Sequence, residues 1–324
     1  MHNVQGRNPN EPIKCWARVY PTDSSAPAAT TWTYGLGNVA RSAPGWFFVQ
    51  TLATSMTLTI VFLLLLLGCF TGFAAGLLGI GGGMLMTPFL TMLLPMAGVS
   101  DQVVVHAAIA TSLATIMFTS LSSVRAHNSR GAVRWNIVAG VAPGILVGAL
   151  LGSKVSSLMP TFWLALLFAC FVGFSAVKMF LNAKPKATRE LPGFGGMFLA
   201  GNLIGVVSAL VGAGGGFISV PLMLWCNVKM HHAVGTSAAL GFPIAAAGTI
   251  GYVWTGWSVP GLPDGMLGYV HLPALFSIAC ASVCLAPVGA KVAHSIDTKP
   301  LKRIFACLLF VICGYMLWKA FQNW

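Results

Sequence analysis

The chain has 324 residues, of which 56% are hydrophobic and 7% are charged, and its formal net charge is +12. This composition excludes an ordinary soluble domain and predicts an all-α polytopic membrane protein, because apolar runs long enough to cross a bilayer recur from about residue 52 to residue 322. The basic residues are scattered among short loops, which argues against nucleic acid as a partner and favours a lipid bilayer around the chain.

The first 50 residues are polar and precede the apolar region. They contain many Pro, Ser, Thr and Gly residues and lack the apolar core of a secretory signal peptide. We expect residues 1–50 to form a disordered N-terminal extension. The alternative is an organellar transit peptide, because the stretch has few acidic residues.

Ten apolar segments follow, in two sets of five separated by a polar linker at residues 182–193. The first set lies near residues 52–78, 83–97, 102–123, 136–152 and 161–181, and the second near 194–211, 215–226, 232–254, 270–290 and 301–322. The second segment of each set has only about 12–15 residues, whereas a perpendicular span needs roughly 20. We therefore expect 8–10 transmembrane segments, including short helices that begin at glycine-rich breaks.

One glycine-rich sequence occurs in both sets. Residues 72–90 read GFAAGLLGIGGGMLMTPFL, and residues 205–223 read GVVSALVGAGGGFISVPLM. The matching triplets are Gly81, Gly82 and Gly83 in the first set and Gly214, Gly215 and Gly216 in the second. Further short matches follow in the same order, so the pattern predicts two homologous repeats, residues 51–181 and residues 194–324.

Loop charges predict that the two repeats are inverted. Arg125, Arg130 and Arg134 flank the loop after the third segment, whereas residues 255–269, at the equivalent place in the second repeat, include no Lys or Arg. The positive-inside rule places these loops on opposite sides of the membrane. An odd number of five spans per repeat predicts the same, although a re-entrant short segment would remove this second argument.

The helix starts after the two glycine triplets are candidate anion-binding groups. A helix that begins after Gly83 or Gly216 leaves its first N–H groups without partners in the helix. In lipid an anion can accept these hydrogen bonds, helped by the helix dipole, and glycine lets it approach the backbone closely. Such a site requires no metal and no cofactor. The alternative is that the glycines only allow tight helix packing.

Hydroxyl side chains at matching positions extend this candidate substrate site. Thr111 and Ser112 in the first repeat match Thr236 and Ser237 in the second, and all four fall midway along their predicted helices. Hydroxyl groups can bind an oxyanion in a dry cavity. Alternatively, they donate to carbonyl groups of their own helices or contact a neighbouring helix.

Histidines near the third segments support two further hypotheses. His106 and His231 occupy matching positions and are candidates for carrying a transport-coupled proton, or else they are hydrogen-bonding residues at the membrane interface. An intramembrane serine hydrolase would use Ser237 as nucleophile, with His231, His232 or His271 as base. The first repeat contains the same Thr-Ser and His elements, whereas a hydrolase needs one nucleophile, so we expect no enzyme activity.

The GIGGG…Pro element, the His-x4-Thr-Ser element and their repetition resemble the TauE/SafE family of sulfite exporters and related anion permeases. The resemblance covers roughly residues 60–322. It implies a secondary transporter of a small anion, such as sulfite or an organosulfonate, by alternating access around a site between the glycine-rich breaks. We expect such a protein in the plasma membrane. The alternative from a different class is a membrane assembly or scaffold protein that carries no substrate.

Overall fold

The computed structural model describes residues 58–78, 82–181, 190–293 and 298–322, which belong to one compact unit. The predicted N-terminal extension, Gly81 and most of the predicted linker lie outside these described residues.

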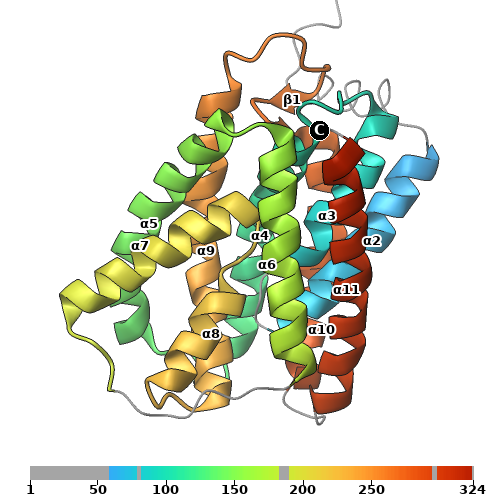
Figure 1. The fold of residues 1–324 in the computed structure, drawn as a ribbon. Helices are drawn as coiled ribbons and strands as arrows, with labels where there is room; N and C mark the ends of the chain where they lie inside the picture. The colour runs from blue at the N-terminus through green and yellow to red at the C-terminus, as the bar shows by residue number, and fades with distance from the viewer. Residues whose placement is uncertain (1–57, 79–81, 182–189, 294–297, 323–324) are drawn as a thin grey trace, which may run out of the picture. The chain divides into compact units, whose positions relative to one another are not determined.

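The secondary-structure elements of the described residues are helices, apart from one small hairpin (Figure 1). The helices of the first half are α2 (Leu58–Leu78), α3 (Gly83–Leu93), α4 (Val104–Asn128), α5 (Trp135–Leu158) and α6 (Thr161–Phe180), with a 3-10 turn η1 (Pro95–Ala97). Those of the second half are α7 (Phe194–Val211), α8 (Gly216–Trp225), α9 (Met230–Gly256), α10 (Leu272–Ala293) and α11 (Thr298–Gln322). Among the described helices, eight are long and apolar enough to cross a membrane, whereas α3 and α8 are short. The predicted all-α membrane architecture with two short apolar helices is therefore confirmed.

The hairpin between α9 and α10 is not predicted by the sequence analysis. Strands β1 (Met266–Leu267) and β2 (Val270–His271) pair antiparallel. The turn between them contains Gly268, whose φ of 56° lies in the left-handed region that glycine adopts without strain. Strand β2 is buried and packs against α4, α9 and α10.

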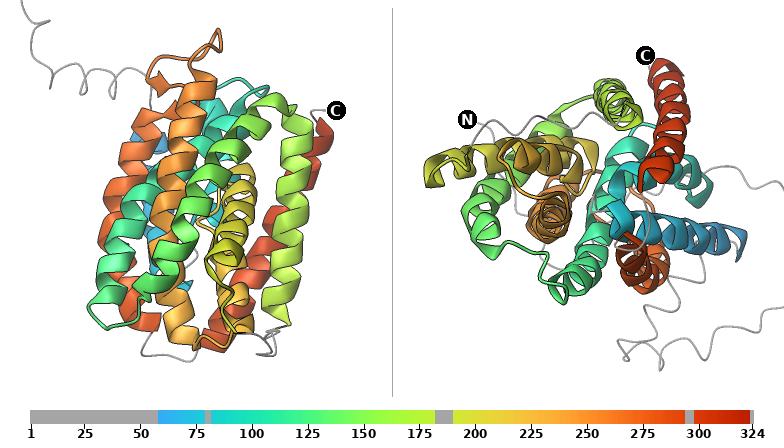
Figure 2. Two further views of the ribbon diagram at one scale, coloured as in Figure 1. Left: turned by 90° about the vertical axis from the view of Figure 1, so that its left-hand side faces the viewer. Right: turned by 90° about the horizontal axis from the view of Figure 1, so that it is seen from below.

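Helices from the two halves of the chain pack against each other. Helix α2 packs along α10, α5 along α7, α6 along α11 and α4 along α9. The loop between α4 and α5 and the hairpin loop between α9 and α10 lie at opposite ends of the helical bundle (Figures 1 and 2). The long central helices α4 and α9 therefore run in opposite directions.

Glycines allow two of these pairs to pack closely. A Cβ atom on Gly72 of α2 would lie 2.5 Å from the Cα atom of Ser282 on α10, too close for any real side chain. On the other pair, a Cβ atom on Gly144 of α5 would overlap the carbonyl oxygen of Phe198 on α7. Small residues commonly allow such close backbone approach in membrane helices. The packing explanation therefore holds for the glycines inside these long helices.

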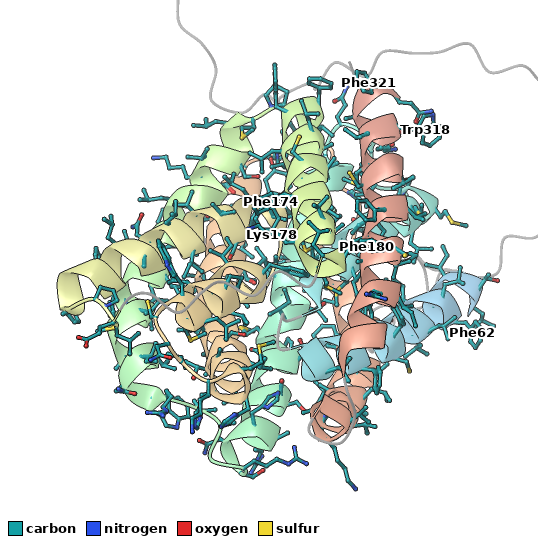
Figure 3. All side chains as sticks on the ribbon, turned by 60° about the horizontal axis from the view of Figure 1, so that its bottom comes forward. Phe62, Phe174, Lys178, Phe180, Trp318 and Phe321 are labelled. Carbon is teal, nitrogen blue, oxygen red and sulfur yellow. The ribbon has the colours of Figure 1, made fainter. Side chains whose placement is uncertain are left out.

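The outward faces of the helices carry large apolar side chains. Figure 3 labels six residues on the outer faces of three helices: Phe62 on α2, Phe174, Lys178 and Phe180 on α6, and Trp318 and Phe321 on α11. Their aromatic side chains are between 46% and 67% exposed. The ammonium group of Lys178 lies 5.5 Å from the centre of the Phe174 ring, within the range of a cation–π contact. A surface of this kind is suited to lipid rather than to water.

Candidate functional site

Helices α3 and α8 begin with the same backbone turn. Gly82 has φ 70° and ψ −14°, and Gly215 has φ 74° and ψ −10°. The Gly82 carbonyl accepts a hydrogen bond from the Met86 N–H at 3.1 Å, and the Gly215 carbonyl accepts one from the Ser219 N–H at 2.9 Å. Each helix therefore starts directly after a left-handed glycine, and its first N–H groups are left for a partner outside the helix.

The start of α3 lies against the end of α7. Gly212 ends α7 in the left-handed conformation. Ser112 Oγ shares its proton between the Gly212 carbonyl at 3.2 Å and the Ile109 carbonyl of its own helix at 2.9 Å. A Cβ atom on Gly83 would overlap the Gly212 carbonyl oxygen. Ser112 Oγ also lies 3.0 Å from Thr87 Oγ1, and both hydroxyls are fully buried. The structure thus brings the predicted site residues Gly83 and Ser112 together, beside Gly212 and Thr87.

The matching residues of the second half lie on α8 and α9. Ser237 is fully buried, and its Oγ donates to the Val234 carbonyl of its own helix at 3.2 Å. The Gly214 carbonyl oxygen lies against α9, 3.7 Å from where a Cβ atom on Gly241 would stand. Gly241 is one helical turn beyond Ser237, so this break lies beside the same stretch of α9. Gly216, the first residue of α8, is buried.

The predicted threonines bind the main chain of the opposite half. Thr111 Oγ1 accepts the His271 N–H at 3.0 Å, directly before α10. Thr236 Oγ1 accepts the Arg134 N–H at 3.0 Å, directly before α5. These bonds connect the third helix of each half to the fourth helix of the other. A threonine hydroxyl that accepts such a bond retains its own proton for donation.

The two predicted histidines have different surroundings. His106 is buried, its Nε2 lies 3.0 Å from the Ser156 carbonyl oxygen, and its ring stacks on Tyr269 with centroids 5.3 Å apart. His231 is exposed, and its ring lies 4.1 Å from the ring of His232. The structure therefore does not give them equivalent environments.

Another buried histidine caps helix α10. His271 Nδ1 accepts the Ala274 N–H at 3.2 Å, so the proton of the neutral ring is on Nε2, which has no hydrogen-bond partner among the described residues. Burial lowers the pKa of His271 to about 4, because the charged ring would lose its hydration. From the sequence, His271 is a candidate only for a hydrolase base, and its capping role is not predicted.

The sequence also does not indicate a role for two buried serines. Ser208 on α7 and Ser219 on α8 are each 1% exposed, and their hydroxyls have no hydrogen-bond partner among the described residues. Neither serine belongs to a polar pair repeated in both halves, because Ala75 and Met86 occupy the matching positions of the first half. The signal in the sequence that indicates them is their proximity to the second glycine triplet.

In the described part of the chain, eight apolar spans and two short helices that open on buried glycine turns define a multi-pass integral membrane protein with features of a transporter. Residues 64–316 match the family model described as sulfite exporter TauE/SafE, and the chain belongs to this family. The resemblance read from the sequence motifs is confirmed.

Relatives from bacteria and an archaeon are named as transporters. A probable membrane transporter protein of Haemophilus influenzae is 33% identical over 263 residues, which cover 81% of this chain and 99% of the relative. The probable membrane transporter protein YdhB of Bacillus subtilis is 30% identical, with 75% of this chain and 93% of the relative covered. The probable membrane transporter protein MJ0441 of Methanocaldococcus jannaschii is 26% identical, with 79% and 94% covered. No solved structure matches the chain.

Proposed function

We propose that this protein is a secondary transporter of a small, sulfur-containing anion, such as sulfite or an organosulfonate, in the plasma membrane. The observation that carries the proposal is the pair of left-handed glycine turns at Gly82 and Gly215, which open two short buried helices in the same conformation. Helix N-termini of this kind bind anions without a buried cation. The name of the family, sulfite exporter, supports the choice of anion.

The proposed architecture is two inverted repeats, residues 51–181 and 194–324, joined by residues 182–193. Helix pairing supports this architecture. When each helix is replaced by its equivalent in the other half, the α2–α10 pair becomes the α7–α5 pair, and the α4–α9 and α6–α11 pairs stay the same. The Thr111–His271 and Thr236–Arg134 hydrogen bonds exchange in the same way.

A second pair of hydrogen bonds also supports inverted repeats. His127 Nε2 lies 3.3 Å from the Gly76 carbonyl oxygen, which joins the end of α4 to the end of α2. The Tyr252 hydroxyl donates to the Ala209 carbonyl at 3.0 Å, which joins α9 to the end of α7. The repeat alignment matches His127 with Tyr252 and Gly76 with Ala209. Different side chains thus make the same connection in each half.

In the proposed mechanism the substrate binds between the two glycine-rich breaks, and the repeats move relative to each other to expose it on alternate sides. The ligands are main-chain N–H groups and hydroxyls from both halves: Gly81, Gly82, Gly83, Thr111, Ser112, Gly214, Gly215, Gly216, Thr236 and Ser237. His106 and His231 are the candidates for proton coupling. The burial of one and the exposure of the other are consistent with one closed and one open end.

Flux into proteoliposomes tests this function. Purified protein should carry radiolabelled sulfite or an organosulfonate, whereas Gly83→Leu should abolish flux, since its side chain would overlap the Gly212 carbonyl oxygen. Gly314→Leu on α11 is the matched control, because nothing lies within 4 Å of a Cβ atom there. Absence of flux for every anion tested would overturn the proposal, as would equal flux in the two variants.

A further inference from the structure

A threonine on the third helix of each half holds the segment that precedes the fourth helix of the other half. Thr111 Oγ1 on α4 accepts the His271 N–H, and both residues are fully buried. Thr236 Oγ1 on α9, also fully buried, accepts the Arg134 N–H. Each threonine lies in the first third of its helix, and α4 and α9 run in opposite directions (Figures 1 and 2). The two hydrogen bonds therefore lie toward opposite ends of the bundle.

At one end, the hairpin packs between α4, α9 and α10. Tyr269, which precedes strand β2, stacks on His106 of α4 and meets the Tyr252 ring of α9 edge-on, with the latter centroids 6.2 Å apart. All three rings are buried. A Cβ atom on Gly256 would lie 2.4 Å from the Tyr269 nitrogen, so the backbones of α9 and the hairpin are in close contact. The hairpin thus fills this end of the bundle.

At the other end, the loop between α4 and α5 packs against the start of α9. The Ala132 carbonyl oxygen lies 3.1 Å from His232 Nδ1, and a Cβ atom on Gly235 would lie 2.9 Å from the Ala132 Cβ atom. Ala132 and Val133 are 1% and 8% exposed. The loop contains no aromatic residue, so small side chains and hydrogen bonds hold it in place.

Each of these threonines is followed by a serine that lies at a glycine-rich break. Ser112 follows Thr111 and lies 3.0 Å from Thr87 at the start of α3. Ser237 follows Thr236, on the stretch of α9 beside the second break. Consecutive residues thus contact a break and the segment that fills one end of the bundle. Because a helix moves as a rigid element, a shift of α4 or α9 at the break also displaces the threonine oxygen.

We propose that the Thr111 and Thr236 hydrogen bonds are the latches of two gates, one formed by the hairpin and the other by the α4–α5 loop. Each latch holds one end of the bundle closed and is broken when that end opens. The inference rests on the proposed transport function, because a carrier that exposes one site on alternate sides must open its two ends at different times. Both latches are formed in the structure, which therefore has both ends closed. Since each threonine oxygen only accepts, its hydroxyl proton remains available to a bound anion.

Cysteine reporters at matching positions test the two latches in purified protein without any substrate. Val270 and Val133 directly precede the two N–H donors, and both are buried. The reaction rate of Val270→Cys or Val133→Cys with a water-soluble maleimide is measured in a background without the native cysteines. Thr111→Val leaves an unsatisfied N–H in the closed hairpin gate, so it should accelerate the reaction at position 270 by about 5- to 150-fold and leave position 133 unchanged. Thr236→Val should have the opposite selectivity.

Two control variants separate loss of a latch from general loosening of the helices. Thr115→Val removes a buried hydroxyl that donates to the Thr111 carbonyl of its own helix at 2.8 Å. Such a bond within one helix closes no gate, so both rates should stay within about twofold of those in the unsubstituted background. Thr111→Ser retains an acceptor oxygen, so the reaction at position 270 should remain slow.

The outcomes separate this inference from the proposed function. Unchanged rates in both valine variants, or an equal increase at both positions, would overturn the latches, and anion flux through the unmodified protein would then leave the transport function standing. Fast reaction at position 270 in Thr111→Ser would also overturn the inference. Failure of every anion to cross the membrane, together with reaction selective for one end, would instead overturn the transport function.

Discussion

Replacing Gly212 with alanine tests whether the end of α7 contacts the hydroxyls of α3 and α4. Gly212 has φ 65°, a conformation that costs a residue with a Cβ atom about 1–2 kcal/mol. The added Cβ atom would also stand 2.8 Å from both Ser112 Oγ and Thr87 Oγ1, and relieving such overpacking costs about 1–3 kcal/mol. Gly212→Ala should therefore lower the free energy of unfolding by about 2–5 kcal/mol.

Gly98→Ala supplies the matched control, because it carries the backbone cost without the contact. Gly98 has φ 87°, and nothing lies within 4 Å of a Cβ atom there, so the loss should be about 1–2 kcal/mol. Both variants would be unfolded in mixed micelles with rising SDS while tryptophan fluorescence is followed. Equal losses in the two variants would refute the contact between Gly212 and the buried hydroxyls.

Three further predictions follow from the structure. Ser112→Ala should destabilise the protein by about 1–3 kcal/mol because it leaves the Gly212 carbonyl without its hydroxyl donor. The control is Ser282→Ala, because that buried hydroxyl donates to the Ala279 carbonyl of its own helix, and an equal loss in the two variants would contradict the prediction. The pKa of His271 is about 4 in the folded protein and 6.5 in the unfolded chain. Between pH 6.5 and about 4, the His271 ring is therefore protonated in the unfolded chain and neutral in the folded protein. The free energy of unfolding should therefore fall by about 3 kcal/mol as the pH drops from 6.5 to about 4, and His271→Asn, which keeps a capping oxygen, should flatten this part of the profile. Single cysteines at Asn128 and Gly261, in a background without the native cysteines, should react with impermeant reagents from opposite sides of the membrane, and reaction of both from one side would exclude inverted repeats.

The sequence predicts the helices well because the bilayer sets their length. Apolar runs near residues 136–152 and 301–322 become α5 and α11, with ends shifted by a few residues. The short helices are predicted equally well, since the glycine triplets mark where α3 and α8 begin. The hairpin at residues 266–271 is missed because two-residue strands carry no detectable periodicity.

The candidate site is only partly predictable. Repetition identifies Ser112 and the glycine triplets, but it cannot show that Thr111 accepts a main-chain N–H from the opposite half. Repetition also hides Ser208 and Ser219, because polar side chains present in only one repeat do not produce a matched pair. Contacts between distant parts of the chain are needed to find them.

The pairing of α2 with α10 has a consequence for synthesis of the protein in the cell. Helix α2 leaves the ribosome before the other described helices, yet its Gly72 packs against α10, which is made almost last among them. The first half therefore remains in the membrane without its α10 partner, with the Gly72 face of α2 uncovered, until the second half has been translated. Long-range pairing of this kind makes assembly slow, and it exposes the unfinished chain to quality-control proteases. A chain stopped at the linker should be degraded, and co-expression of the missing half as a separate polypeptide should protect it.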